Sequence, residues 1–293
     1  MRWSPSGRSS DLEDRRGQSR GFGMGGGRMK IGLGGALVLL VLSLIFHQDF
    51  FSLLAGGGVD TGPMPAADSG GIAPVQTSSE EENLVDFVSF VLDDDQGMWD
   101  QLLPKTYGVP YQHAKLVLYR DMTQTGCGVG QAATGPFYCP ADQKLYVDLG
   151  FYDELRQRFG APGDFAQAYV LAHEIGHNVQ AILGTDAKVL SASRRNPSQA
   201  NALSVRMELQ ADCYAGVWGH SAAQRNKLDP GDVQEGLQAA AAVGDDRLQR
   251  MSTGSVDADS FTHGTSEQRM QWFRRGFESG DPRSCDTFGS GTE

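Results

Sequence analysis

The pentapeptide HEIGH lies in the middle of a segment whose sequence predicts an amphipathic helix. The segment begins at Asp164, a good helix N-cap after a Pro-Gly pair, and ends at Gly184, a typical C-terminal stop. Four residues advance a helix by about 400°, so His173 and His177 project from one face, one turn apart. Two imidazoles so placed can bind one tetrahedral zinc ion. Glu174 is rotated by about 100°, which leaves its carboxylate free to reach a water molecule on the metal.

A catalytic zinc site needs a third protein ligand and one open position. Glu208 is the best candidate, because a helix predicted over residues 196–218 could return antiparallel beside the first and present it to the metal. Asp212 follows one turn later on the same face and could accept a hydrogen bond from the non-ligating nitrogen of His173. The alternative is a solvated acidic stripe. His220, expected beyond the end of this helix, is the rival ligand.

Several longer stretches carry a family resemblance. HEIGHNVQ followed by ELQADCYAGVW resembles the bacterial neutral zinc metallopeptidases of the YpfJ type, and LEDRRG, ATGPFYCPADQKLYVD and FTHGTSEQR extend the likeness over most of the chain. The Glu-x-x-x-Asp after H-E-x-x-H also resembles the gluzincins, in which that Glu is a ligand and that Asp supports a ligating histidine. The resemblance implies an α+β, mainly helical fold: a thermolysin-like zincin core of the minigluzincin kind, with a small β-sheet, an active-site helix and a membrane anchor.

The motif and the resemblance together predict a zinc-dependent metallopeptidase, with endopeptidase activity, one Zn²⁺ ion and a peptide or protein substrate. Glu174 would activate the metal's water. By analogy with gluzincins that use a downstream His or Tyr, His263 is the candidate for stabilising the oxyanion; a surface histidine capping the next helix is the alternative. Tyr214 and Tyr138 are weaker candidates, and Arg269 is expected to be solvated. The competing function is a membrane-tethered zinc-binding scaffold without turnover.

The N-terminal region predicts membrane anchoring. Residues 31–54 are almost entirely apolar and predict one transmembrane helix, with a cleaved signal peptide or a buried core helix as alternatives. Residues 1–30 hold seven basic and three acidic residues, 7 − 3 = +4, and are expected to be a disordered cytoplasmic tail. Residues 55–79 read as a flexible linker, and residues 80–293 as the metallopeptidase domain. The expected location is the inner membrane, single-pass, with the catalytic domain periplasmic or extracellular.

The charge of the remaining chain bears on its partners. Residues 31–293 hold 18 basic and 33 acidic residues, 18 − 33 = −15. Nucleic-acid binding needs a basic face that displaces phosphate counterions, so an acidic body argues against it. The expected partners are therefore a protein substrate and a lipid bilayer.

All four cysteines follow the apolar segment, and an even number in an oxidising compartment predicts two disulfides. Cys127 and Cys139 flank a short glycine-rich segment and form the preferred local pair. Cys213 would then pair with Cys285. Four cysteines allow three pairings, so the others stay open.

Short β-strands are predicted over residues 114–120 and 144–148. The second precedes the HEIGH helix and is a candidate for the edge strand of a substrate cleft, to which an extended peptide could add; an ordinary interior strand is the alternative. Further helices are predicted at the caps Ser79, Asp229 and Thr265, and over residues 151–159.

Overall fold

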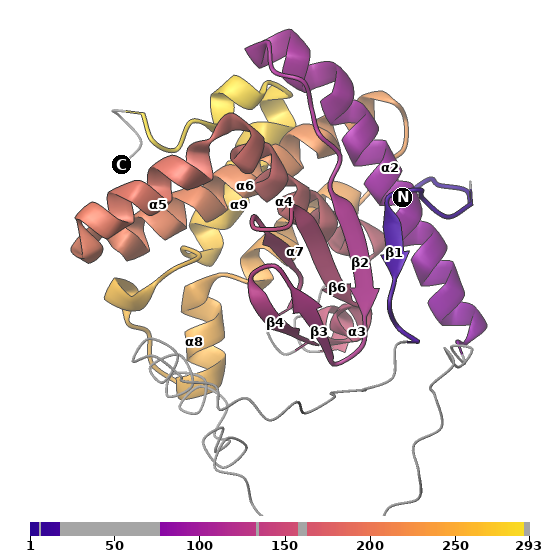
Figure 1. Ribbon diagram of the computed structural model, residues 1–293, viewed down its shortest axis with the longest axis horizontal. Helices are drawn as coiled ribbons and strands as arrows, with labels where there is room; N and C mark the ends of the chain where they lie inside the picture. The colour runs from indigo at the N-terminus through magenta and orange to yellow at the C-terminus, as the bar shows by residue number, and fades with distance from the viewer. Residues whose placement is uncertain (6, 18–76, 133–134, 158–162, 290–293) are drawn as a thin grey trace, which may run out of the picture.

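A computed structural model of the protein describes residues 1–5, 7–17, 77–132, 135–157 and 163–289. The described part is mainly helical with a small sheet, as expected for the α+β class (Figure 1). Its helices are α2 (Ser79–Tyr107), α3 (Gly150–Gln157), α4 (Asp164–Leu183), α5 (Thr185–Arg195), α6 (Ala200–Gln224), α7 (Asp232–Ala242), α8 (Asp245–Thr253) and α9 (Ser266–Ser279). Its strands are β1 (Leu12–Asp14), β2 (Lys115–Tyr119), β3 (Met122–Thr125), β4 (Gly128–Gln131), β5 (Phe137–Cys139) and β6 (Lys144–Asp148).

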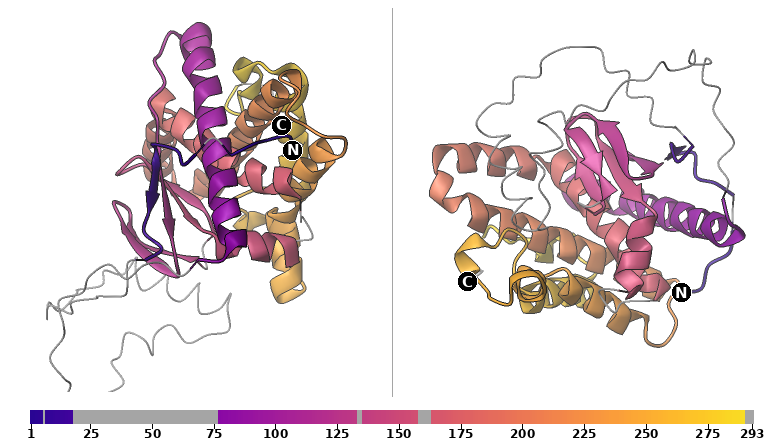
Figure 2. Two further views of the ribbon diagram at one scale, coloured as in Figure 1. Left: turned by 90° about the vertical axis from the view of Figure 1, so that its right-hand side faces the viewer. Right: turned by 90° about the horizontal axis from the view of Figure 1, so that it is seen from below.

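The main sheet has the order β1-β2-β6-β5, with β1, β2 and β6 parallel and β5 antiparallel to β6. The prediction that residues 144–148 form an edge strand is therefore wrong. Leu145, Tyr146 and Val147 are all fully buried, so this strand has both faces covered and neighbours on both sides. The edge nearest the HEIGH helix is β5, which contacts α4. The two views of Figure 2 place the sheet on one side of the molecule and α9 on the other.

Helix α4 has the predicted position and lies between α2, α6 and α7. It ends at Gly184, whose φ of 70° is a conformation that glycine adopts without strain. Its N-cap is Gly163 rather than Asp164, and the N-cap of α2 is Ser78 rather than Ser79.

Helices α6 and α9 approach each other through two glycines. A Cβ atom on Gly216 would lie 2.1 Å from the carbonyl oxygen of Phe273, and one on Gly276 would lie 1.9 Å from that of Cys213. The backbones are therefore in direct contact. The same seam carries the disulfide between Cys213 and Cys285. Helix α6 runs to Gln224, beyond the predicted end, and α5 and α8 were not predicted.

The second disulfide joins the β3–β4 hairpin to the sheet. Cys127 lies in the hairpin turn and is bonded to Cys139, the last residue of β5. Both predicted disulfide pairs are thus confirmed. The hairpin and the edge strand of the sheet are covalently one unit.

Residues 1–5 and 7–17, which we call the N-terminal strap, lie against the domain. The strand β1 pairs with β2, and Trp3 packs on the ring of Phe87 with centroids 5.2 Å apart. The expectation of a disordered tail is wrong for these residues, because β1 pairs with β2 and the buried side chain of Arg16 forms ion pairs with Asp14 and Glu81. No helix in the described ranges is long and apolar enough to cross a membrane. The predicted transmembrane segment, residues 31–54, lies outside the described residues, as does most of the predicted linker.

Candidate metal centre

The structure brings together the three residues predicted to bind the metal. Their donor atoms on His173, His177 and Glu208 all lie within 4.8 Å of one another. The His173 Nε2 atom is 3.1 Å from Glu208 Oε2, and the His177 Nε2 atom is 3.6 Å from Glu208 Oε1. The predicted return of α6 beside α4 is therefore confirmed. The approach is close because Gly176 lies against Ala211, where a Cβ would be 3.1 Å from the Ala211 Cα atom.

This donor set fits a zinc ion. Donors about 2.0–2.1 Å from a tetrahedral zinc lie about 3.4 Å from one another, and the two measured separations lie on either side of that value. Two imidazoles with one carboxylate are also a ligand set used by catalytic zinc sites. The side chains of His177 and Glu208 are each 17% exposed, so solvent reaches part of this donor set.

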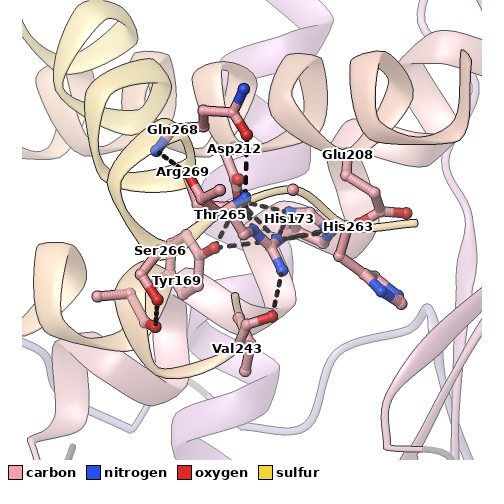
Figure 3. A network of polar contacts seen from close by, with 12 residues as sticks. Tyr169, His173, Glu208, Asp212, Val243, His263, Thr265, Ser266, Gln268 and Arg269 are labelled. Atoms are coloured by element: carbon pink, nitrogen blue, oxygen red, sulfur yellow. Dashed lines mark hydrogen bonds and ion pairs between the residues drawn. The ribbon is translucent and has the colours of Figure 1, made fainter. Parts of the chain in front are cut away.

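Asp212, the carboxylate predicted to support His173, belongs to the network of polar contacts shown in Figure 3. Asp212 is fully buried, and its Oδ1 atom lies 2.9 Å from His173 Nδ1. Tyr169 donates a hydrogen bond to the same oxygen at 2.5 Å. Arg269 donates to both oxygens of Asp212, at 2.7 and 2.8 Å. Because the Arg269 side chain is only 3% exposed, the expectation that it is solvated is wrong.

The charges of this network shift the titration of its members. Burial alone would lower the pKa of His173, but the hydrogen bond and the charge of Asp212 outweigh burial and raise that pKa to about 9. Burial opposes ionisation of Glu208, yet the charge of His177 and the hydrogen bond from His173 hold the pKa of Glu208 below its usual range. Without a metal, the raised pKa favours the imidazolium form of His173 at neutral pH, paired with the carboxylates of Asp212 and Glu208. A cation that binds there takes the place of a proton.

Glu174, the predicted general base, is buried, with 7% of its surface exposed. No hydrogen bond to its carboxylate is found among the residues that the structure describes. Burial, with a smaller contribution from the charge of Glu174, raises the pKa of Tyr152, whose hydroxyl is itself buried and unpartnered within the described ranges. A carboxylate without a competing donor can accept a proton from a water molecule.

His263, the candidate oxyanion donor, lies in the loop before α9, near Glu208 and His173 (Figure 3). Its side chain is 48% exposed, and its Nδ1 atom lies 3.1 Å from Asp245 Oδ1. The hydrogen bond with Asp245 raises the pKa of His263, burial opposes the rise, and the charge of Glu208 adds to it. The alternative role as a helix cap is excluded, because Thr265 caps α9.

The other candidates lie elsewhere or are sequestered. His220 lies within α6, not beyond it, and its Nδ1 is hydrogen-bonded to the carbonyl of Phe277 at 2.7 Å. Tyr214 is buried against Trp99, with ring centroids 5.4 Å apart. The Tyr138 hydroxyl is buried and has no partner within the described residues.

Two residues of the site were missed from the sequence. The Nδ1 atom of His177 lies 2.8 Å from Gln180 Oε1, and the Gln180 amide donates to the carbonyl of Met207 at 2.8 Å. Gln180 therefore orients His177 much as Asp212 orients His173. Helical spacing could have found both Gln180, three residues after His177, and Tyr169, four residues before His173.

A helix pair that presents two histidines, a glutamate and an unpartnered buried carboxylate defines a candidate mononuclear zinc centre. Comparisons with known proteins agree: a family model described as "Putative neutral zinc metallopeptidase" matches residues 1–288. The Escherichia coli protein YpfJ is 49% identical over 295 residues, 99% of each chain. A Mycobacterium tuberculosis relative is 42% identical over 202 residues, 65% of this chain and 66% of that protein. No solved structure gives a significant match. The chain belongs to the neutral zinc metallopeptidase family.

Proposed function

We propose that this protein is a membrane-associated zinc endopeptidase with a zincin-type core. The observation that carries the proposal is the convergence of His173, His177 and Glu208, with Glu174 next to His173 on the same helix. A zinc ion held by these three residues would supply a water of lowered pKa and polarise the scissile carbonyl. Membership of a zinc metallopeptidase family supports zinc-dependent peptide hydrolysis in general.

The side chains of the site would then have separate roles in the reaction. The Glu174 carboxylate accepts the proton of the attacking water and passes it to the leaving amine. His263, half-exposed beside the ligands, donates a hydrogen bond to the oxyanion. Asp212 and Gln180 hold the two imidazole rings with their Nε2 atoms toward Glu208.

Substrate binding is proposed at β5. This strand ends the sheet within the described residues and contacts α4. An extended peptide that added there by main-chain hydrogen bonds would lie near the catalytic helix with both ends free, as internal cleavage requires. We further propose that residues 31–54 attach the protein to the cell membrane. Two disulfides favour an extracytoplasmic location for the domain.

The direct test is the variant Glu174→Gln in the full-length protein. It should bind zinc with the stoichiometry of the parent and lose cleavage of an unfolded protein substrate by at least about 100-fold. Glu278→Gln, at an exposed position on α9, is the matched control and should cleave normally. Equal cleavage by Glu174→Gln and the parent would refute the mechanism. Zinc binding without cleavage by the parent would favour the scaffold function.

A further inference from the structure

The first inference concerns the buried guanidinium of Arg269. It holds both oxygens of Asp212 in a two-pronged arrangement, and its Nη1 atom donates to the carbonyl of Val243 at 3.3 Å. Arg269 is brought there by the backbone contact between α6 and α9 at Gly276. Its position is therefore fixed from several sides.

The carboxylate that Arg269 holds is the one that faces His173. We propose that Arg269 is a positioning residue of the zinc site, acting through Asp212 to fix the ring of His173; this inference rests on the proposed function. A carboxylate held at one oxygen can swing about its own bond, whereas one held at both cannot. The His173 ring is thereby set with Nδ1 toward Asp212 and Nε2 toward Glu208. Lysine could not replace Arg269, because an ammonium lacks the planar fork.

The test measures zinc affinity of the full-length protein by competition with a chelator. Arg269→Met and Arg269→Lys should each bind zinc about 10- to 100-fold more weakly, the range for residues that orient metal ligands. Their kcat should fall while KM stays near that of the parent. Arg274→Gln, an exposed arginine of the same helix, is the matched control and should bind zinc normally.

A double variant separates positioning from general structural support. If Arg269 acts through Asp212, the double variant Arg269→Met/Asp212→Asn should bind zinc no more weakly than Asp212→Asn alone. Additive losses, or unchanged affinity in Arg269→Lys, would overturn the inference. If Arg269→Met does not fold, Arg269→Lys decides. A parent protein that binds no zinc would instead refute the proposed function, so the two failures are distinguishable.

A second, independent inference concerns the N-terminal strap. Its backbone is part of the sheet: Leu12 to Asp14 are in parallel register with Leu116 to Leu118, and the amide of Arg15 donates to the carbonyl of Leu118 at 2.8 Å. Paired strands lie about 4.8 Å apart. Figure 1 shows β1 beside β2 and α2.

Side chains of the strap also bind the domain. The Arg16 side chain is 1% exposed and forms ion pairs with Asp14 at 2.6 Å and with Glu81 of α2 at 2.8 Å. Ser9 donates a hydrogen bond to Asp93 of α2 at 2.5 Å. Removing the strap would leave Glu81 and Asp93 without these partners and uncover the edge of β2.

These contacts constrain membrane topology. The strap precedes the apolar residues 31–54 in the chain, and β2 follows them. A single crossing between the two would place them on opposite sides of a hydrocarbon layer about 30 Å thick, which is incompatible with strand pairing. We infer that the strap and the metallopeptidase domain lie on the same side of the membrane. The expected arrangement, with residues 1–30 cytoplasmic and the domain outside, does not allow these contacts.

Protease protection in spheroplasts tests this inference. One epitope is inserted after Gly25 and another after the C-terminus of the full chain, and protease is added outside the cells. Both epitopes should be cleaved together or protected together, while a cytosolic marker protein stays intact. Cleavage of one epitope with protection of the other would overturn the inference. The insertion variant should unfold at the same temperature as the parent, and in the uninserted protein a tryptic cut after Arg20 gives the same readout by mass spectrometry.

Discussion

Gly176 offers a sharp test of how the metal centre is assembled. It lies between the two histidines and faces α6, and a Cβ there would be 3.1 Å from both the Cα and the carbonyl oxygen of Ala211. Both atoms belong to the backbone, so Gly176→Ala should push α4 and α6 apart by a few tenths of an ångström. Metal–ligand distances tolerate deviations of about 0.2 Å. The separation of Glu208 from the histidines should therefore leave the range that zinc accepts.

The magnitude follows from two opposing effects. Overpacking costs about 1–3 kcal/mol, whereas replacing a glycine inside a helix by alanine gains about 1 kcal/mol. The metal-free Gly176→Ala protein should thus lose between zero and about 2 kcal/mol of unfolding free energy. Its zinc affinity should fall at least about tenfold, which corresponds to about 1.4 kcal/mol of lost binding free energy.

The assay pairs chelator competition with thermal unfolding, and the chain supplies a matched control. Gly97 lies inside α2 with nothing within 4 Å of an added Cβ. Gly97→Ala should therefore stabilise the protein by about 0.5–1 kcal/mol and leave zinc binding unchanged. If Gly176→Ala behaves like Gly97→Ala in both measurements, close packing of the two helices does not set the metal geometry.

Three further predictions concern protons and cross-links. Because the pKa of His173 is raised to about 9, zinc binding at pH 7.5 should release about one proton, measurable by calorimetry in buffers of different ionisation enthalpy; no release would contradict the pairing with Asp212. The carboxylates around His113 raise its pKa despite burial, so its stabilisation is present below about pH 6.5 and is lost as the pH rises through the raised pKa. This side chain is 40% exposed, so the difference in stability between parent and His113→Gln should stay below about 1 kcal/mol and should shrink at pH 9; a constant difference would refute it. Cys213→Ser opens a cross-link between residues 72 apart and should cost up to about 4.4 kcal/mol of stability by denaturant titration, with no loss in reduced protein.

The sequence revealed those parts of the site that helical spacing determines. His173 and His177 are one turn apart on one predicted helix, and Glu208 and Asp212 are one turn apart on another, so a local spacing rule identifies them. Arg269 could not be found in this way, because its burial depends on two helices distant in the chain meeting at Gly276.

The predictions for strand β6 and for the strap were wrong because both depend on contacts that the local sequence does not show. Strands β1 and β5 have only three residues each, too few to show a periodic pattern, so the neighbours of β6 could not be assigned. In the strap, the basic residues indicated a solvated tail beside a membrane. Arg16 instead satisfies its charge on carboxylates of α2 that lie 65 and 66 residues further along the chain.

The seam between α6 and α9 also determines which substitutions the protein can tolerate. At Gly216 and Gly276 the facing atoms are carbonyl oxygens, and backbone cannot change rotamer to admit even a methyl group. A saturation library selected for folded protein should therefore recover only glycine at these two positions, while exposed Arg274 two residues away accepts nearly every side chain. The absence of a side chain at these two glycines therefore fixes the position of α9 along α6, and with it the contact between Arg269 and Asp212.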